Sequence, residues 1–285
     1  MQKIIKGKSE INYSYATIKM TQSRIDKGLI AIPASLGKLF PDHADTIHVY
    51  LDDSHILITP KYTPRTGSTR ECRIYTMKEW FGKNKIKDGD EIVIQVIDRK
   101  NYIYRLTSEN KFIEKTKRLQ NNLDKSETED EASEKIITLA KWTNLDRYKI
   151  IMNEYRRLVN TMPFKERHST GKQLNRVREK VPVSTKTLLE GIYKGHCQVC
   201  DFWFLKRDHK PYFEIHHLDP LKDHHPKNLV VVCGNCHNQF EYANLGKEFN
   251  EHNWLIKVSF NNKPYPVKQA VLTMPTEEFF KEIYI

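Results

Sequence analysis

Long apolar runs are missing from this sequence. None of its hydrophobic stretches approaches the roughly 18 to 20 residues that a membrane-spanning helix needs. The first ten residues, MQKIIKGKSE, are basic but lack the apolar core of a secretory signal. We therefore expect an intracellular, cytoplasmic protein without a membrane partner.

Cysteine is also scarce, with five in 285 residues, and four of them form two pairs of the CxxC type. Cys197 and Cys200 make the first pair, and Cys233 and Cys236 make the second. In an intracellular chain such pairs favour metal binding over disulfides. Two tight turns that each offer two thiolates complete a tetrahedral shell, so we predict a structural zinc site. Cys72 stands alone, and we interpret it as a small packed apolar side chain.

Internal repeats are absent, and acidic residues are too few to balance the basic ones. The net charge is +11. Residues 1–110 contribute +5 (18 basic, 13 acidic), residues 111–190 contribute +6 (18 basic, 12 acidic), and residues 191–285 are neutral, with 11 of each. A basic surplus indicates a polyanionic partner such as nucleic acid, although a solvated basic surface has the same composition.

The first third of the chain carries a clear β-strand pattern. The segments TIHVYLDD, HILITP, CRIYT, EIVIQVID and NYIYRL alternate apolar with polar residues or are rich in β-branched types. Two short helical segments, ASLGKLF after Pro33 and TMKEWFGKN before a DGDE turn, interrupt the strands. We predict that residues 1–110 form a small barrel-like β domain with helical plugs.

Residues 111–183 are predicted to be a charged linker and helical region. Residues 119–134 are polar and poor in apolar side chains, and we interpret them as a linker or domain boundary. Residues 165–180 hold six Lys or Arg against two Glu, as a phosphate-contacting segment or a solvated loop would.

An amphipathic helix is predicted between these two segments. Its apolar residues recur at three- and four-residue spacing: Tyr148, Met152, Tyr155 and Val159. Such a face packs on a neighbouring domain or forms a dimer contact, and the pattern does not choose between the two.

The two CxxC pairs enclose a long insert that carries most of the histidines. Thirty-two residues separate Cys200 from Cys233, and eight of the twelve histidines fall between positions 196 and 252. The insert predicts a strand (YFEIH), a polar loop (LDPLKDHHPK), a second strand (NLVVV) and a helix (CHNQFEYAN). Over about residues 185–245 this order resembles the HNH endonucleases, whose ββα-metal motif is often braced by two CxxC knuckles. The three letters map onto His217, Asn228 and His237.

The resemblance implies an active site for phosphodiester hydrolysis. His217 would be the general base that activates water, since a neutral imidazole suits this role near neutral pH. His216 and His237 would hold a divalent cation, magnesium, manganese or a similar ion, that stabilises the leaving 3′ oxygen. Asn228 would brace the loop that carries His217. Glu241, one helical turn after His237, would ligate the cation directly or through water.

His216 and two further histidines of the insert affect this interpretation. Many HNH endonucleases have Asp where His216 stands, so the metal preference could shift from magnesium towards softer ions. His224 and His225 lie in the predicted loop, and we interpret them as solvent or phosphate contacts rather than ligands. A zinc domain that is only structural would explain the cysteines but not the histidines.

The amino-terminal strands resemble the B-three pseudobarrel of plant transcription factors, a fold also known as the target-recognition domain of some restriction endonucleases. The features shared over residues 15–108 are an Ile-Pro after the second strand, a helix with a Trp-Phe pair and a Gly-Asp turn. The resemblance implies two arms that clamp the DNA major groove, where Arg and Gln read base edges and Lys, Ser and Thr hold phosphates. The residues expected on the arms are Gln22, Ser23, Arg24, Lys27, Lys61, Tyr62, Thr63, Arg65, Ser68, Thr69 and Arg70. Another small barrel, such as an AbrB-like one, would share the Gly-Asp turn.

Together the resemblances imply a sequence-specific type II restriction endonuclease with an α+β multidomain fold. A β pseudobarrel would read double-stranded DNA, a helical linker region would follow, and an HNH domain at residues 184–285 would cut. We expect such an enzyme in prokaryotic cytoplasm and as a homodimer, because one active site per chain cuts one strand. Two alternatives stay open: a nuclease that requires methylated cytosine, and a DNA-binding regulator whose zinc module does not cut.

Overall fold

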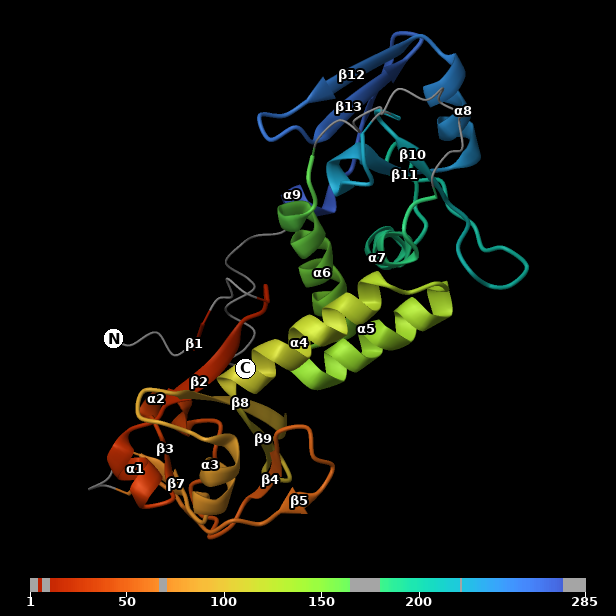
Figure 1. Cartoon of the computed structure of the whole chain (residues 1–285). Coiled ribbons are helices and arrows are strands. Elements are labelled where there is room, and N and C mark those ends of the chain that lie inside the picture. The colour runs from red at the N-terminus through yellow and green to blue at the C-terminus, as the bar shows by residue number, and fades with distance from the viewer. Residues whose placement is uncertain (1–4, 7–10, 67–70, 165–179, 221, 274–285) are drawn as a thin grey trace. The chain divides into compact units, whose positions relative to one another are not determined.

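The computed structural model describes residues 5–6, 11–66, 71–164, 180–220 and 222–273 (Figure 1). The chain forms two compact units, one of Met1–Asn121 with Thr138–Asp146 and the other of Asn122–Ile137 with Arg147–Ile285. The predicted α+β class is confirmed, with strands and helices in both units. Among the described helices, none is both long and apolar enough to cross a bilayer.

The amino-terminal unit is built from two β-sheets. The larger has six strands in the order β1-β2-β8-β9-β4-β5, and the smaller has the order β3-β7-β6. Every pairing is antiparallel except β4 with β9. The strands are β1 (Ile5–Lys6), β2 (Tyr15–Lys19), β3 (Ile30–Ile32), β4 (His48–Leu51), β5 (Leu57–Ile58), β6 (Tyr62–Thr63), β7 (Cys72–Ile74), β8 (Glu91–Asp98) and β9 (Ile103–Ser108).

Alternation along these strands directs one set of side chains into a shared core, which includes Ile30, Ile74 and Leu106. The two predicted helical segments are present as α2 (Ala34–Gly37) and α3 (Lys78–Asn84). A further short helix, α1 (Gln22–Asp26), lies beside α3 in the first expected arm (Figure 1). Cys72 is buried in the core, as its isolated position in the sequence predicted.

Residues 119–134 are not an extended linker, which corrects the prediction from composition. Most of them lie in two helices, α4 (Glu109–Asp124) and α5 (Glu129–Thr143). Three of the six acidic residues of this segment, Glu129, Asp130 and Glu131, stand in the first turn of α5, where the helix dipole favours them. The Thr128 hydroxyl accepts the Glu131 amide and so caps that turn. The chain passes from one compact unit to the other after Asn121, Ile137 and Asp146, and the first of these points lies inside the segment.

The carboxy-terminal unit begins with a pair of packed helices. The predicted amphipathic helix is α6 (Arg147–Thr161), and it packs against α7 (Val183–Tyr193). Met152 and Tyr155 are buried, whereas Tyr148 is exposed. A Cβ on Gly191 of α7 would stand 2.6 Å from Ile151, so glycine permits this close approach. The part of α6 that carries Met152 and Tyr155 is therefore packed within its own unit, whereas Tyr148 stays exposed.

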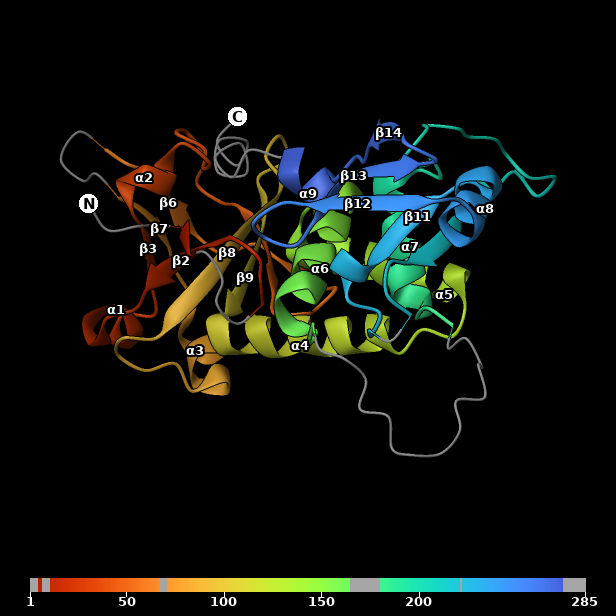
Figure 2. The ribbon, with the colours of Figure 1, turned by 90° about the horizontal axis from the view of Figure 1, so that it is seen from above.

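The remainder of this unit contains the predicted strand, loop, strand and helix. Strands β10 (Glu214–His217) and β11 (Leu229–Val232) are antiparallel, the turn η1 (Pro226–Asn228) precedes β11, and α8 (Gly234–Tyr242) lies beside both strands (Figure 2). A three-stranded sheet and a short helix follow: β12 (Leu245–Phe249), β13 (Leu255–Phe260), β14 (Lys263–Pro266) and α9 (Ala270–Thr273). Val230, Phe240 and Leu255 join these parts in one core.

Candidate active site

The four paired cysteines converge at one point. Cys197 and Cys200 lie on the turn after α7, Cys233 is the N-cap of α8, and Cys236 lies in the first turn of that helix. All four sulfur atoms lie within 4.8 Å of one another, and the Sγ atoms of Cys200 and Cys233 are 3.6 Å apart. Bonds of about 2.3 Å to a tetrahedral zinc would place sulfurs roughly 3.8 Å apart, so the cluster fits this ion.

Proton sharing among the thiols agrees with a cation site. The hydrogen bond from Cys236 lowers the pKa of Cys197 to about 4, and the same bond raises the pKa of Cys236. Burial raises the pKa of Cys200 to about 11. A divalent ion at this point would displace the thiol protons, because only thiolates ligate it.

The doubled histidine sits at the end of β10, where its two rings face opposite ways. His216 pairs with Val230 and His217 with Leu229 across the ladder, so adjacent side chains alternate between the two faces. The His216 ring is buried and stacks on Phe240 of α8, with centroids 4.4 Å apart. His217 turns towards the loop that follows the strand.

Three side chains form a second cluster suited to a divalent cation. Ligand atoms of His216, His237 and Glu241 lie within 4.8 Å of one another, and His216 Nδ1 is 3.8 Å from Glu241 Oε1. His237 and Glu241 are four residues apart on α8 and share one helical face. Two imidazoles and one carboxylate suit first-row ions such as manganese, cobalt, nickel or zinc, and a carboxylate also suits magnesium.

Glu214 supports this cluster and was missed in the sequence. It stands two residues before His216, hence on the same face of β10, and its carboxylate bonds to His237 Nδ1 and accepts the Tyr212 hydroxyl. The hydrogen bond from Tyr212, and then that with His237, lowers the pKa of Glu214, while the pKa of Tyr212 is raised to about 12. A carboxylate on one ring nitrogen orients the other nitrogen of a ligating histidine towards its metal.

The loop histidines are not solvent or phosphate contacts, which corrects that interpretation. His224 is 8% exposed, and its Nδ1 lies 3.0 Å from Nε2 of His217. His225 is also buried; its Nδ1 accepts the Lys227 amide and its Nε2 lies 3.2 Å from the Val159 carbonyl oxygen. Desolvation lowers the pKa of His225. The loop folds inward instead of projecting into water, and this decides where both rings lie.

Asn228 holds that loop in its folded form. Its Oδ1 accepts the Asp219 amide at 2.9 Å, and its Nδ2 donates to the carbonyls of Asp219 and Asp223 at 2.9 and 3.0 Å. The Leu218 amide donates to the Asn228 carbonyl, which ties the residue after His217 to the same point. The side chain is buried, so these bonds are shielded from water.

The residues expected to contact DNA are spread over the amino-terminal unit, and several already have protein partners. Gln22 bonds to Asp26, Arg24 to Glu71, and Arg65 to Asp42. Ser23, Lys27 and Lys61 are exposed, and Thr63 is half-buried. Ser68, Thr69 and Arg70 lie outside the described residues, as does the basic stretch 165–179.

Tyr62 is excluded from the expected DNA-contacting set. Its side chain is 2% exposed, it lies in the core between the two sheets, and its hydroxyl donates to the Pro41 carbonyl at 2.8 Å. Burial raises the pKa of this hydroxyl, so it is neutral at every physiological pH. The arm prediction failed here because strand alternation places every second residue of β6 inwards.

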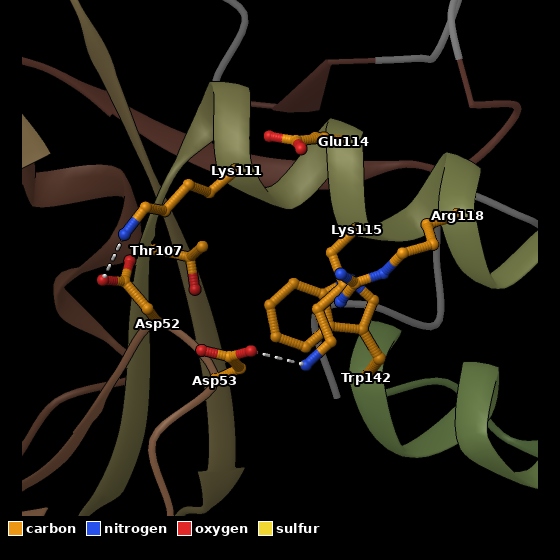
Figure 3. A pocket seen from close by; sticks show the side chains of 8 residues that line it. All are labelled: Asp52, Asp53, Thr107, Lys111, Glu114, Lys115, Arg118 and Trp142. Carbon is orange, nitrogen blue, oxygen red and sulfur yellow. Dashed lines mark hydrogen bonds and ion pairs between the residues drawn. The ribbon is translucent and has the colours of Figure 1, made fainter.

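A solvent-open hollow of about 150 Å³ adjoins α4 in the same unit (Figure 3). Two of its three basic residues, Lys111 and Lys115, reach across to Asp52 and Asp53, at 3.1 and 3.4 Å, and Arg118 is the third. Lys115 also lies 4.1 Å from the centre of the Trp142 ring. Because three carboxylates, Asp52, Asp53 and Glu114, line the hollow together with its three basic side chains, it does not form a basic patch for a phosphate.

Comparison with known proteins identifies the cysteine- and histidine-bearing segment. Residues 197–241 match the sequence family described as HNH endonuclease. The chain is also 36% identical over 63 residues to the "Type IV methyl-directed restriction enzyme EcoKMcrA" of Escherichia coli (strain K12), a match that covers 20% of this chain and 23% of that protein. The chain thus matches about a quarter of the length of that relative.

Two solved structures from Arabidopsis each match 32% of this chain. One is the FUS3–DNA complex, with 14% identity, a TM-score of 0.27 and 92% of that chain covered. The other is a hypothetical protein of Arabidopsis thaliana, with 15% identity, a TM-score of 0.26 and 85% covered. At these TM-scores the likeness supports no statement about ligand or function.

Proposed function

We propose that this protein is a metal-dependent endonuclease that hydrolyses phosphodiester bonds of double-stranded DNA at the ββα site. The observation that carries the proposal is the convergence of His216, His237 and Glu241, with His217 as the next residue along β10, inside the segment that matches the HNH endonucleases. The chain also has a net charge of +11, which favours a polyanionic substrate.

His217 acts as the general base. A neutral imidazole takes a proton from the attacking water, and its partner His224, 3.0 Å away, holds the ring in one orientation. Asn228 keeps the loop with His224 against the strand end, so base and partner move together. A base held in one orientation can position the attacking water against the phosphate, which lowers the entropic part of the barrier.

His216, His237 and Glu241 hold the divalent cation, and Glu214 orients His237. When bound, the cation supplies Lewis acidity to the phosphoryl group and the leaving 3′ oxygen. The four-cysteine cluster holds structural zinc and fixes the start of α8, from which His237 and Glu241 project.

The two candidates for the substrate differ in whether the protein requires a specific base sequence or a modified base in its DNA. A sequence-specific type II enzyme is the candidate that the sequence suggested, with the amino-terminal unit as reader. A modification-dependent enzyme is the second candidate, and the relative whose name says "methyl-directed" favours it. Cleavage of both strands would further suggest a homodimer, which sedimentation of the protein on its DNA would test.

The decisive experiment compares unmodified and cytosine-methylated copies of the same DNA with magnesium, manganese, cobalt or nickel. The proteins are the wild type, His217→Ala and the control His252→Ala, whose side chain is 68% exposed at the surface. We expect cleavage by the wild type and control, and a loss of about 100- to 10,000-fold in His217→Ala.

Each result separates the candidates. Discrete fragments from unmodified DNA support the type II reading, and fragments from methylated DNA alone support the modification-dependent one. Tight DNA binding without cleavage in any metal would contradict the nuclease proposal and leave a DNA-binding regulator with a structural zinc module.

A further inference from the structure

A hairpin that carries exposed aromatic side chains lies between the first cysteine pair and β10. Its four consecutive apolar residues are all well exposed: Phe202 (55%), Trp203 (43%), Phe204 (41%) and Leu205 (47%). Figure 1 shows this segment as the teal loop near β10 and α7. Single exposed apolar residues are ordinary, but a run of four on an ordered loop marks a contact surface.

The hairpin is held in place and is not a frayed loop. The Trp203 indole donates to the Lys194 carbonyl at 2.8 Å, and its ring stacks on His196. The backbone of Phe202 bonds to Cys197, and Lys206 bonds to Lys210 across the turn, at 3.1 and 2.9 Å. Ordering this segment costs conformational entropy, although its apolar rings stay exposed to solvent.

The tip of the hairpin is basic. The sequence KRDHK at 206–210 carries three cations against one carboxylate. Lys206 pairs with Asp208 and Lys210 with Asp130, but the partners are exposed, and exposed ion pairs are weak enough for a phosphate to displace them. Aromatic rings beside a basic tip are the combination that proteins use to stack on bases while they neutralise phosphates.

The root of the hairpin leads into the candidate active site. Phe204 stacks on Tyr212, with ring centroids 4.8 Å apart and planes 24° apart. The Tyr212 hydroxyl donates to Glu214, and Glu214 bonds to His237. A ligand that contacts Phe204 is thus connected to the cation cluster through Tyr212 and Glu214.

We infer that the hairpin 201–211 is a DNA wedge of the nuclease unit, in which Phe202 and Phe204 stack against bases next to the bond to be cut and the basic tip binds the adjacent phosphates. This inference rests on the proposed function for its partner, DNA. It places a contact surface on the cutting unit itself, separate from the reader.

The test measures DNA affinity by fluorescence anisotropy at several salt concentrations, in a His217→Ala background so that the DNA stays intact. Phe204→Ala removes the stacking ring and Arg207→Ala removes one tip cation. Phe249→Ala on β12 (45% exposed) and Lys263→Ala on β14 are matched controls in the same unit. Zinc content and thermal melting confirm that each variant is folded.

We expect Phe204→Ala to weaken binding roughly 5- to 100-fold with an unchanged salt slope, because stacking releases no counterions. Arg207→Ala should reduce the salt slope by about one, and both controls should match the parent protein. Phe204→Tyr should restore affinity, whereas Phe204→Leu should not. If Phe204→Ala fails to fold, this last pair carries the test.

Two results would overturn the wedge. One is affinity in the Phe204 variants equal to that of the controls. The other is a dimer in sedimentation that Phe204→Ala converts to a monomer, since the rings would then bind a second copy. Cleavage is measured separately in the protein that keeps His217. Cleavage there, with unaltered affinity in the Phe204 variants, would sink the wedge and keep the nuclease; reduced affinity in those variants, with no cleavage by the His217 protein in any metal, would do the reverse.

Discussion

The two units differ in how closely chemistry-bearing residues gather. In the carboxy-terminal unit, the sulfur atoms of four cysteines lie within 4.8 Å of one another, and so do the ligand atoms of the candidate cation site, His216, His237 and Glu241. In the amino-terminal unit, residues expected on the DNA arms are dispersed, several are tied to carboxylates, and Tyr62 is buried. A metal site constrains every ligand to one point, whereas a DNA-binding face tolerates wide spacing and changes of partner, so its residues are harder to identify.

The largest effect is expected when a zinc ligand is removed, because the structure of the carboxy-terminal unit depends on the metal and that of the amino-terminal unit does not. Cys233→Ser removes a zinc ligand, and because zinc binding of about 10–16 kcal/mol is largely folding free energy in such sites, the ββα segment should lose its structure. Zinc content and limited proteolysis measure the effect. The control Cys72→Ala, in the other unit, should keep full zinc content, and a protease-resistant, zinc-free Cys233→Ser would contradict the assignment.

A smaller effect is expected at Glu214. Glu214→Gln keeps the shape but loses the charge that orients His237, so the affinity for manganese should fall about 10- to 100-fold. Calorimetric titration of the zinc-loaded protein measures this directly. Glu248→Gln, on exposed β12, serves as the control. An unchanged manganese affinity would show that Glu214 does not support the cation cluster.

Acid should weaken the carboxy-terminal unit through His225. Burial lowers the pKa of this ring in the folded state, so the unfolded chain binds the proton more readily. The contribution of the neutral His225 ring to the free energy of unfolding is fully present above the ordinary histidine pKa of about 6.5. It is lost as the pH falls through the lower pKa of the folded state. His225→Asn keeps an acceptor for the Lys227 amide but does not titrate, so its melting temperature should depend less on pH between 7 and 5. If the melting temperatures of the wild type and His225→Asn fall equally between pH 7 and 5, His225 does not cause the loss of stability in acid.

The smallest effect is expected in the amino-terminal unit, where it separates a buried residue of the predicted arm from an exposed one. Tyr62→Phe removes the hydrogen bond to Pro41 and should cost about 1 kcal/mol of unfolding free energy without changing DNA affinity. Lys61→Ala, at an exposed neighbour, should do the opposite by weakening DNA binding and lowering its salt slope. Denaturant unfolding and anisotropy measure the two quantities. Reduced DNA affinity in Tyr62→Phe would show that this tyrosine does contribute to DNA binding, as the sequence predicted.

The local order of the ββα segment was predictable because it depends on short-range pattern. The strand period of EIHH, the CxxC turns and the four-residue step from His237 to Glu241 are all set within a few residues. The acidic stretch 119–134 was misjudged for the complementary reason. Its composition resembles a linker, but its acidic residues match a helix N-terminus, and only the packed helices distinguish the two readings.

By itself the sequence determined the cysteine pairs, the strand–loop–strand–helix order and the candidate ligands, because each follows from residue type and spacing along the chain. Tertiary structure alone decided that His224 meets His217, that Glu214 reaches His237, and that Tyr62 turns into the core. These contacts depend on how a loop folds back or how a sheet closes, and the burial that fixes them comes from residues distant in sequence.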